Sequence, residues 1–387
     1  MRLRRRAFCA LAGAGLVLPR NARAADLAAN CAAAIHSQMD LLPAGPVLLN
    51  SYLVESGGSA FDITQANAAY VYDNALAGLL LLAAGHENAA RRIGQALAIA
   101  QAHDRKFSDG RLRNCYQAGL MTQPAKLAGF WDAKAKQWDE DPYQLGSFTG
   151  PIAWAMLLWA ALGMQAPANA AGDFLNSQLR APNGYYGGFY GFDPAQQKLT
   201  WQSTEQNIDL VAAFRRLGRT KDADHAAGFV RAAYDATDGV FKAGLAPNGG
   251  KNALLAADAG IWPYLAALGT KASALNAISA LHHSGGIGFS SASQGVWLEG
   301  TAFAALALKL MGDKQADAFL ATVTKNISPQ GYVYATVAPV LSTGLTVGPS
   351  LKQGTPEQAF NYYRRPALSA TAWAGLAALV VNPLSAS

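Results

Sequence analysis

Single carboxylates interrupt segments of this sequence that are otherwise almost entirely apolar. Asp73, Asp258 and Glu299 each stand alone near the start of such a segment, and Glu205 and Asp209 share another. A carboxylate in apolar surroundings must be paired or have a strongly shifted pKa, and such groups suit general acid–base chemistry. Helix capping, or stabilisation by the helix dipole, explains any one of them without chemistry. Several acids meeting at one mouth would favour a functional site.

The densest polar run is residues 203–209 (STEQNID). Ser203 followed by Gln206 predicts a capping box at a helix start. That interpretation leaves Glu205 and Asp209 unexplained, and their spacing of four places both on one helical face.

Aromatic residues accumulate near the same positions. Flat aromatic rings pack against the CH faces of sugars while neighbouring polar groups bind the hydroxyls. Packing within the core or the loops is the competing explanation for each ring. Trp201 and Tyr363 are the strongest candidates for ligand contact, because they stand close to loop-to-helix junctions. The full set of predicted aromatic contacts is Tyr116, Trp201, Trp262, Trp297 and Tyr363.

Six Ala/Leu-rich segments must position these side chains. Most are apolar on nearly every face, which indicates helices buried on all sides. Five end in glycine, which tolerates a left-handed helix end, and the sixth ends at Asn-Pro. The segments are residues 71–85, 148–163, 203–218, 255–269, 297–312 and 368–383.

More amphipathic helices alternate with the apolar ones. Six buried helices alternating with six half-exposed ones predict an all-α (α/α)6 toroid, with an inner ring of parallel helices inside an outer ring. An open α-solenoid also alternates helices, but its loops would be more uniform. The predicted outer helices are residues 26–42, 87–103, 168–179, 221–236, 272–282 and 314–327.

The connections differ sharply in length. After an inner helix the chain turns within one or two residues, whereas before one it runs long. Long connections in a compact domain are usually functional, and these are rich in aromatic residues and glycine. They must collect at the end of the barrel where the inner helices start, which is the candidate cleft. The long connections are residues 104–147, 180–202, 237–254, 283–296 and 328–367.

The charge distribution bears on partners and on export. The chain carries 31 Lys+Arg against 25 Asp+Glu, yet six arginines and no acids fall in its first 24 residues, so the remainder is balanced. The basic excess therefore gives no reason to expect nucleic acid as a partner. A composition of 51% hydrophobic and 14% charged residues also excludes a disordered chain.

Residues 1–24 are predicted to be an export signal of the twin-arginine type. Residues 5–8 (RRAF) fit that pattern, an apolar run follows, and residues 22–24 (ARA) form a cleavage site. The apolar run is too short to span a bilayer, which argues against the alternative of an uncleaved anchor. We therefore expect a periplasmic or secreted protein with no stable membrane insertion after signal removal, and one catalytic domain over residues 25–387.

The cysteines allow one disulfide at most. Cys9 leaves with the signal, so Cys31 and Cys115 remain. An oxidising compartment permits a bond between them, and the sequence does not decide whether they meet.

Four segments resemble the six-hairpin glycosidase group, the (α/α)6 proteins that include glycoside hydrolases, some polysaccharide lyases and sugar epimerases. The segments are residues 72–76 (YDNAL), 203–205 (STE) with 207–209 (NID), 296–301 (VWLEGT) and 370–373 (ATAW). They are spread over most of the mature chain, and as motifs they are moderately specific.

The resemblance implies an exported glycoside hydrolase acting on a poly- or oligosaccharide. Such enzymes use two carboxyl groups, and many toroid members invert the anomeric centre. On this basis Glu205 is the expected general acid, with Asp73 or Glu299 as the base. Asp209 and Asp258 would tune pKa values or hold sugar hydroxyls.

Other toroid functions make different demands. A polysaccharide lyase would need a base such as tyrosine and a cation for the uronate, and the long loops do hold Arg111, Arg113, Arg364 and Arg365. A non-catalytic glycan-binding protein needs only the aromatic cleft, and it would lose little affinity if either acid were removed. Lyase and binding protein therefore remain open beside hydrolase, as does endo- versus exo-action.

Three further classes fit the sequence poorly. An epimerase would want a histidine base, yet all six histidines fall on predicted outer helices or at their ends. A zinc cyclase of the lanthionine type lacks its Cys and His ligands, and a prenyl-diphosphate enzyme lacks its aspartate cluster. No motif indicates a metal or an organic cofactor.

Overall fold

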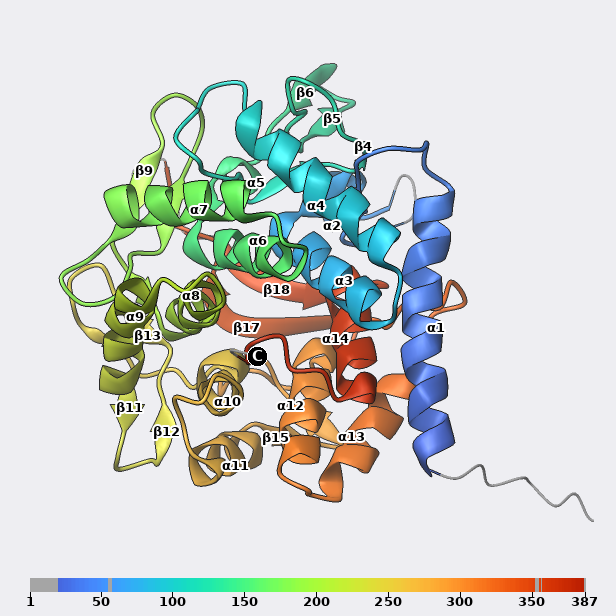
Figure 1. Ribbon diagram of the computed structural model, residues 1–387, viewed down its shortest axis with the longest axis vertical. Coiled ribbons are helices and arrows are strands. Elements are labelled where there is room, and N and C mark those ends of the chain that lie inside the picture. The colour runs from blue at the N-terminus through green and yellow to red at the C-terminus, as the bar shows by residue number, and fades with distance from the viewer. Residues whose placement is uncertain (1–19, 55–57, 352–354, 356, 386–387) are drawn as a thin grey trace, which may run out of the picture.

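Six helical hairpins form a closed toroid (Figure 1) in the computed structural model, which describes residues 20–54, 58–351, 355 and 357–385. Each inner helix contacts the next one along the chain, and the last contacts the first. The ring is therefore closed, which confirms the (α/α)6 toroid and excludes an open solenoid. The inner helices are α3 (Val71–Ala83), α6 (Thr149–Ala161), α8 (Thr204–Arg216), α10 (Ala257–Leu265), α12 (Leu298–Leu310) and α14 (Leu368–Leu379).

An outer helix packs against each inner one. On α4, for example, Ile93, Leu97 and Ala100 recur at helical spacing and are fully buried, so one face of the helix covers the ring. The first outer helix packs on α14 and so closes the outer layer. The outer helices are α1 (Arg20–Asp40), α4 (Glu87–Ala102), α7 (Gln165–Phe174), α9 (Thr220–Ala232), α11 (Lys271–Ala280) and α13 (Gln315–Thr324), with a π-helical turn over Leu175–Leu179 extending α7.

The predicted export signal falls largely outside the described residues, which begin at Arg20. The expected cleavage site, residues 22–24, lies in the first turn of α1. Among the described residues no helix is both long enough and apolar enough to cross a membrane.

The connections between the helices contain short helices and strands that the sequence analysis did not predict. The short helices are α2 (Ala60–Gln65) and α5 (Pro142–Leu145). The strands are β1 (Val47–Leu48), β2 (Ala68–Tyr70), β3 (Cys115–Gln117), β4 (Gly119–Leu120), β5 (Phe130–Asp132), β6 (Gln137–Asp139), β7 (Ser147–Phe148), β8 (Gly188–Tyr190), β9 (Gln197–Leu199), β10 (Gln202–Ser203), β11 (Tyr234–Asp235), β12 (Val240–Phe241), β13 (Gly244–Leu245), β14 (Lys251–Asn252), β15 (His282–His283), β16 (Gly286–Ile287), β17 (Val340–Thr346) and β18 (Ala359–Tyr363).

The strands tie successive hairpins together through antiparallel pairs. The residues that enter an inner helix pair with the long connection of the next hairpin: β2 with β3, β7 with β8, and β10 with β13. Single bridges repeat the pattern for the fourth and fifth hairpins, Ala256 with Ser290 and Trp297 with Thr336. For the sixth, Ala367 pairs with Tyr52 near the chain start. The connections therefore close into a ring above the helices.

Side chains in the first turns hold these connections in place. In α3, the amide of Asn74 accepts from Leu49 N–H at 2.7 Å and donates to the carbonyl of the same residue. In α8, Asn207 forms the equivalent pair of bonds with Tyr185. Each amide therefore pairs with both backbone groups of one residue in a connection and anchors that connection to the helix.

Four of the six inner helices end as predicted. The glycine after each of these four has φ between 70° and 84°, a conformation that side chains disfavour. The prediction is wrong for Gly269, because α10 stops early and Ala267 takes the left-handed position with φ 55°. After α14, Val380 takes it with φ 57°. The four glycines are Gly85, Gly163, Gly218 and Gly312.

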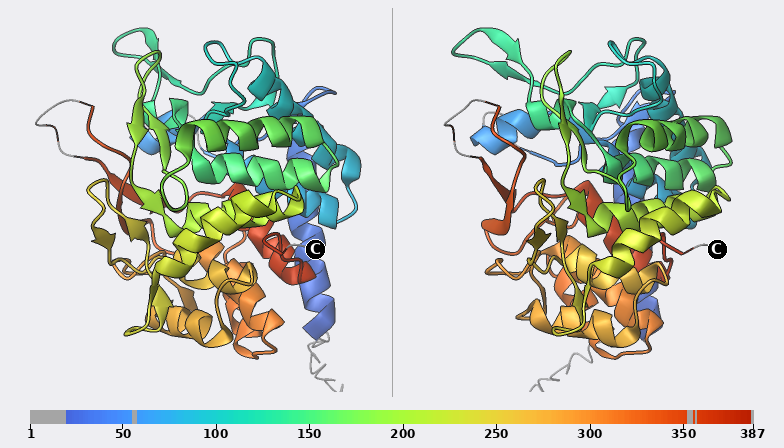
Figure 2. Two further views of the ribbon diagram at one scale, coloured as in Figure 1. Left: turned by 60° about the vertical axis from the view of Figure 1, so that its left-hand side comes forward. Right: turned by 90° about the vertical axis from the view of Figure 1, so that its left-hand side faces the viewer.

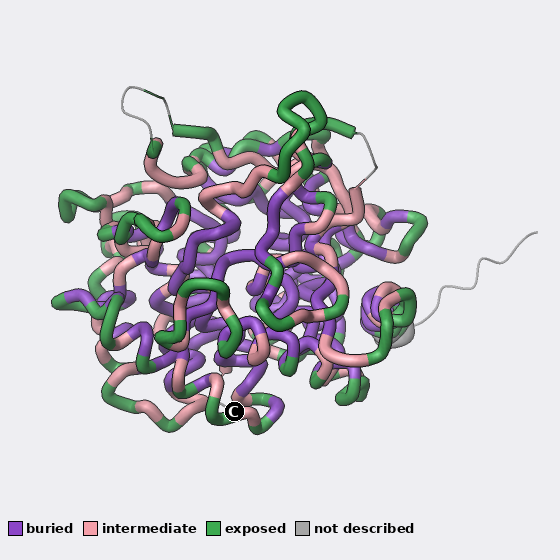
Figure 3. Tube along the Cα trace, turned by 90° about the horizontal axis from the view of Figure 1, so that it is seen from above, coloured by how far each residue is buried: buried purple, intermediate pink, exposed green. Residues whose placement is uncertain are grey.

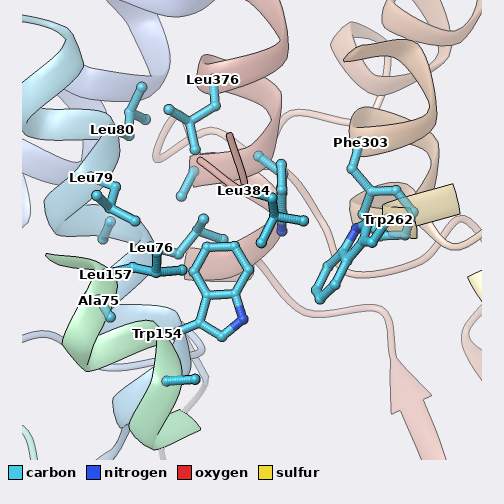
Figure 4. Close-up of a cluster of buried hydrophobic side chains, with 14 of the residues drawn as sticks. Ala75, Leu76, Leu79, Leu80, Trp154, Leu157, Trp262, Phe303, Leu376 and Leu384 are labelled. Atoms are coloured by element: carbon cyan, nitrogen blue, oxygen red, sulfur yellow. The ribbon is translucent and has the colours of Figure 1, made fainter. Parts of the chain in front are cut away.

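The core lies on the toroid axis and is rich in tryptophan. Trp154, Trp262 and Trp373 come from three inner helices and pack edge-to-face or tilted, with ring centroids 5.6–5.7 Å apart. Leu384 from the C-terminal segment inserts beside them (Figure 4) and is fully buried. The carbonyl of Leu265 accepts from the amide of Asn382 and fixes that segment. The chain end therefore closes the barrel at the C-terminal ends of the inner helices.

The strands and long connections gather on the opposite face (Figure 2). Buried residues fill the interior, whereas exposed residues follow the loops at the periphery (Figure 3). Cys31 and Cys115 are both buried as free thiols, so they form no disulfide.

Candidate active site

One large pocket, with a volume of about 1150 Å³, opens at the N-terminal ends of the inner helices. Its wall includes α2, the loop around Trp201 and the β17–β18 arm. Arg365, beyond the end of β18, pairs with Asp62 of α2 at 2.6 Å and so joins two parts of the rim that are far apart in sequence. The pocket therefore lies at the end of the barrel where the long connections were expected to form a cleft.

The second residue of every inner helix lines this pocket. Three of the six are acids, from successive helices of the ring, and the others are a tyrosine, a glycine and a serine. Because the inner helices start at one level, the same helical position faces the axis in each. The six residues are Tyr72, Gly150, Glu205, Asp258, Glu299 and Ser369.

Glu205 is partly buried at the pocket wall. Ser203 caps its helix start, because the Ser203 hydroxyl accepts from Gln206 N–H at 3.2 Å, but the Gln206 side chain does not bond back, so only half of the predicted capping box forms. No described residue forms a hydrogen bond with the Glu205 carboxylate. Removal from water, and then the charges of Asp258 and Glu299, raise its pKa well above the usual range. A raised pKa favours the protonated form, which is the form a general acid needs.

Glu299 is held by two hydroxyl donors. Tyr72 donates to one carboxylate oxygen at 2.6 Å and Ser369 donates to the other at 2.7 Å. Tyr72 in turn accepts from the indole N–H of Trp373 at 2.8 Å. Burial raises the pKa of Glu299 to about 8, although both hydroxyl donors lower it. The network fixes the carboxylate in one orientation toward the pocket.

Asp73 and Asp258 stand on helices that face each other across the ring, α3 and α10. Burial raises the pKa of Asp73 to about 7 and that of Asp258 to about 6. Asp258 accepts from the neighbouring backbone N–H of Ala259 at 2.6 Å. Backbone N–H groups lower the pKa of Asp258 against burial, as the Ser51 hydroxyl lowers that of Asp73. Neither carboxylate forms an ion pair with any described residue, so each keeps lone pairs for a ligand.

Asp209 does not line the pocket, contrary to its predicted role in substrate binding. It lies one turn deeper than Glu205, fully buried, and neither of its carboxylate oxygens has a hydrogen-bond partner among the described residues. Burial, and then the charges of Glu205 and Asp258, raise its pKa well above the usual range. A side chain at Gly150 would meet its carboxylate at 3.1 Å. Asp209 is therefore placed to influence Glu205 electrostatically, which leaves the predicted tuning role in place.

Four of the five predicted aromatic residues line the pocket: Trp201, Trp262, Trp297 and Tyr363. A side chain at Gly187 would lie 2.5 Å from the Trp201 ring, so this glycine allows the ring to reach its position. Tyr116 is the exception. It is fully buried in the core, where its hydroxyl accepts from Arg113 N–H at 2.9 Å.

The four loop arginines do not reach the pocket. Arg113 is buried between Asp104 and Asp193, and Arg111 binds Asp109. Arg364 donates to Asn326 and to backbone carbonyls, and Arg365 binds Asp62. Among the pocket-lining residues that the structure describes, Lys198 is the only cation and no histidine is present. The described residues also hold no group of three His, Cys, Asp or Glu placed to share a metal ion.

Sequence reasoning missed Tyr72 and Ser369 as partners of a carboxylate. Tyr72 entered the sequence analysis only as part of the segment 72–76, and Ser369 not at all. Their position in the helix could have identified them, because both are the second residue of their helix, as Glu205, Asp258 and Glu299 are.

Replacing Tyr72 by phenylalanine should raise the pKa of Glu299, because one of the two donors to the ionised carboxylate is lost. If Glu299 acts as the base, the acidic limb of the pH–activity profile moves to higher pH, and kcat/KM at neutral pH falls by about 10- to 100-fold. A pH–rate profile measures both. Tyr332→Phe is the control, since the Tyr332 hydroxyl is buried without a partner among the described residues. An acidic limb that stays at the wild-type pH in Tyr72→Phe would contradict the role of the Tyr72 hydroxyl in stabilising the ionised Glu299.

The buried acids make folding stability depend on pH in a defined direction. Their folded-state pKa values lie above the usual value of about 4. Their contribution to the unfolding free energy is therefore fully present below about pH 4, and it is lost as pH rises through the folded-state pKa values. Replacing Asp209 by asparagine should therefore raise the unfolding free energy by roughly 1–3 kcal/mol at pH 8 and by less at pH 4.5. Urea unfolding at both values measures this, and equal effects at the two would contradict it.

Comparison with known proteins adds evidence on the fold. No protein-family model matches the chain, and no curated protein matches it. Among solved structures, a glycosidase variant matches 96% of this chain and 99% of its own, with 15% identity and a TM-score of 0.61. A D-mannose isomerase covers 92% and 97%, with 11% identity and a TM-score of 0.60. A sugar epimerase from a ruminal bacterium covers 92% and 98%, with 11% identity and a TM-score of 0.59. These proteins share the fold over nearly its whole length.

Proposed function

We propose that the protein is a glycoside hydrolase that cleaves a poly- or oligosaccharide in the pocket at the inner-helix N-termini. The observation that carries this proposal is the set of carboxylic acids around one aromatic-lined pocket. Two of these acids differ in their hydrogen-bond partners. Glu205 has no hydrogen-bond partner among the described residues and favours its protonated form, whereas Glu299 receives two hydroxyl donors that favour its ionised form. Glycoside hydrolysis requires one protonated and one ionised carboxyl group. Two hydroxyl donors lower the pKa of Glu299, which burial raises to about 8, whereas no donor lowers the pKa of Glu205, so Glu299 is the more readily ionised of the two.

In the proposed mechanism Glu205 donates its proton to the glycosidic oxygen as the bond to the anomeric carbon breaks. Glu299, oriented by Tyr72 and Ser369, accepts a proton from the attacking water. Inversion follows if that water enters from the face opposite the leaving group. We favour Glu299 over Asp73 as the base because the charge of Glu299 acts directly on the pKa of Glu205.

The structural neighbours are compatible with this proposal without selecting it. One of the glycosidase structures, a glutamate-to-alanine variant, is in complex with glucose, and it covers 96% of this chain at 16% identity. The epimerase and the isomerase are about as similar in fold. The absence of histidine from the described pocket lining argues against proton transfer at carbon near neutral pH.

A polysaccharide lyase is the second candidate, because Tyr52, Tyr72, Tyr143 and Tyr362 also line the pocket. A lyase acting on a uronate needs a cation beside the carboxylate, and the pocket offers acids instead. The predicted export to the periplasm stays part of the proposal and does not depend on this choice.

Release of reducing ends from a panel of bacterial and plant polysaccharides tests the proposal. We expect reducing ends without ultraviolet absorbance from unsaturated sugars. Growth of that absorbance would establish a lyase. Glycan binding without any release, unaffected by Glu205→Gln, would instead establish a non-catalytic binding protein.

A further inference from the structure

We propose that the outer face of the β5–β6 hairpin is a second glycan-binding surface, formed by Trp131 and Trp138, that holds a polysaccharide chain outside the pocket mouth. The identity of its ligand rests on the proposed function, because the chain that it holds is the one that the pocket cleaves. The substrate is then a polymer rather than a short oligosaccharide.

Two tryptophans of this hairpin are exposed to solvent. Trp131 is 57% exposed and Trp138 is 42% exposed, whereas the other six tryptophans of the chain lie in the core or line the pocket. Single apolar side chains scattered over a surface need no explanation, but two exposed tryptophans side by side mark a candidate binding surface. The hairpin lies at the edge of the molecule (Figure 1) and projects from the end of the barrel where the long connections gather (Figure 2).

Strand pairing places both rings on one face of the hairpin. Trp131 pairs directly with Trp138, and the side chains of such a pair share a face, with Cβ atoms about 5 Å apart. Phe130 precedes Trp131, so its side chain points to the opposite face, and Phe130 lines the pocket. The hairpin therefore has one face in the pocket wall, and the two tryptophans share its outer face.

A glycine supports the Trp138 ring. A side chain at Gly129 would lie 2.6 Å from Nε1 and 2.8 Å from Cε2 of Trp138, so the ring rests on bare backbone there. In the pocket wall, Trp201 lies over Gly187 in the same way. The chain itself covers part of the Trp138 ring and holds it in place, while the exposed part is available to the CH face of a sugar.

Hydrogen bonds within the hairpin order this surface before any ligand binds. The carboxylate of Asp132 accepts from the backbone N–H groups of Lys134 at 2.7 Å and Ala135 at 2.9 Å. On the returning strand, the side-chain amide of Gln137 donates to the carboxylate of Asp139 at 2.7 Å. A surface that is already ordered loses little conformational entropy on binding.

The charges of the hairpin favour an uncharged ligand. Two aspartates, Asp132 and Asp139, balance two lysines, Lys134 and Lys136. An anionic membrane surface would call for a cluster of basic residues, which this balance does not provide. A neutral glycan needs no charge, because its CH faces pack on the aromatic rings, and two rings on neighbouring strands can contact successive sugar units.

The hairpin is also continuous with the pocket. Helix α2 packs against β5 and lines the pocket through Phe61 and Thr64. A polysaccharide can therefore place one segment in the pocket and another on the outer face of the hairpin, and the second contact is then intramolecular. An oligosaccharide that only fills the pocket gains nothing from the outer face.

Affinity electrophoresis of the mature protein through gels that contain hydroxyethyl cellulose, xylan, galactomannan or amylose tests this surface. Calorimetry follows the matching trisaccharides. Both are measured in the Glu205→Gln background, so that the polymer stays intact. We expect the double variant Trp131→Ala, Trp138→Ala to bind the preferred polymer at least about tenfold more weakly, with a smaller change for the trisaccharide. Phenylalanine at both positions should recover part of the loss.

A matched control and a second readout separate contact from misfolding. Tyr234→Ala removes an exposed aromatic ring from β11, outside the pocket lining, and should bind like the parent protein. Iodide should quench the fluorescence of the exposed Trp131 and Trp138 more than that of the buried tryptophans, and the preferred polymer should protect both rings from iodide.

The outcomes separate this surface from the proposed function. If the double variant keeps its affinity for every polymer, or if none of the polymers binds, the surface is overturned while hydrolysis in the pocket stands. An equal loss for polymer and trisaccharide also overturns it, because the hairpin would then act through the pocket. Retention of a polymer that depends on the hairpin, without any cleavage by the wild-type protein, supports the surface and counts against the proposed function.

Two other occupants would be recognised in the same set of variants. Binding to phosphatidylglycerol vesicles that the double variant loses, with polymer binding unchanged, would assign the rings to a membrane. A dimer in sedimentation that the double variant abolishes, again with polymer binding unchanged, would assign them to a second copy of the chain. Either result overturns the glycan assignment.

Discussion

Glycan hydrolysis by the Glu205→Gln variant is expected to fall by about 10²–10⁴-fold in kcat/KM, because the amide cannot protonate the leaving oxygen. The side chain accepts no hydrogen bond from the described residues, so the amide should be accommodated without disturbing α8. Initial rates on a natural glycan measure the loss. Glu87→Gln, at an exposed helix pair with Arg91, is the matched control and should retain full activity.

The leaving group distinguishes the acid from the base. An aryl glycoside whose leaving group needs no protonation should lose much less activity in Glu205→Gln than a natural glycan does. Glu299→Gln should impair both substrates equally, since the water must still be deprotonated. If Glu299→Gln spares the aryl glycoside and Glu205→Gln impairs both substrates, Glu299 is the acid and Glu205 the base. Full activity in both variants would show that neither residue takes part in the chemistry. Impairment by Asp73→Asn in place of Glu299→Gln would make Asp73 the base.

Replacing Arg113 by methionine is expected to lower the unfolding free energy by about 3–5 kcal/mol, the largest stability effect we foresee. The guanidinium is fully buried and donates to Asp104 at 2.6 Å and to Asp193 at 2.8 Å. Without it, Asp104 has no cation among the described residues and Asp193 keeps only the more exposed Arg105, beneath the loops that lead to the pocket wall. Urea unfolding of the mature protein measures the change.

Two comparisons keep that result interpretable. Arg91→Met removes an exposed pair on α4 and should cost no more than about 0.5 kcal/mol. Adding Asp104→Asn to Arg113→Met should recover part of the loss, because the uncompensated buried charge is gone. A loss below about 1 kcal/mol for Arg113→Met alone would show that the buried ion pairs do not stabilise the loops.

The helical part of the fold could be predicted because its signals are long. An apolar body of about four turns and a one- or two-residue turn after it recur in each repeat, and they are visible without tertiary information. The strands are mostly two or three residues long, below the length at which alternation can be recognised, and their pairing depends on closure of the ring. The β17–β18 arm was read as loop because Gly344 and a register shift interrupt its pattern.

The candidate site was predicted in part for a related reason. The pocket acids share the first turn of the inner helices, which sequence alone locates. Depth along the axis was not readable: Glu205 and Asp209 share a face, yet four residues advance a helix by about 6 Å, and this separates a wall residue from a buried one. Tyr116 was misassigned because a tyrosine in a long loop can face either the pocket or the core. Its position in β3, paired with β2, turns it to the core.

The most direct test of the account is the fate of water in the reaction. The mature protein is incubated with a glycan it degrades in water enriched in heavy oxygen, and the products are analysed by mass spectrometry. Hydrolysis at the Glu205 and Glu299 pair predicts one heavy oxygen at each new reducing end in the early products, and loss of that signal in Glu205→Gln. Products that carry no heavy oxygen and contain an unsaturated sugar would contradict hydrolysis and require elimination instead.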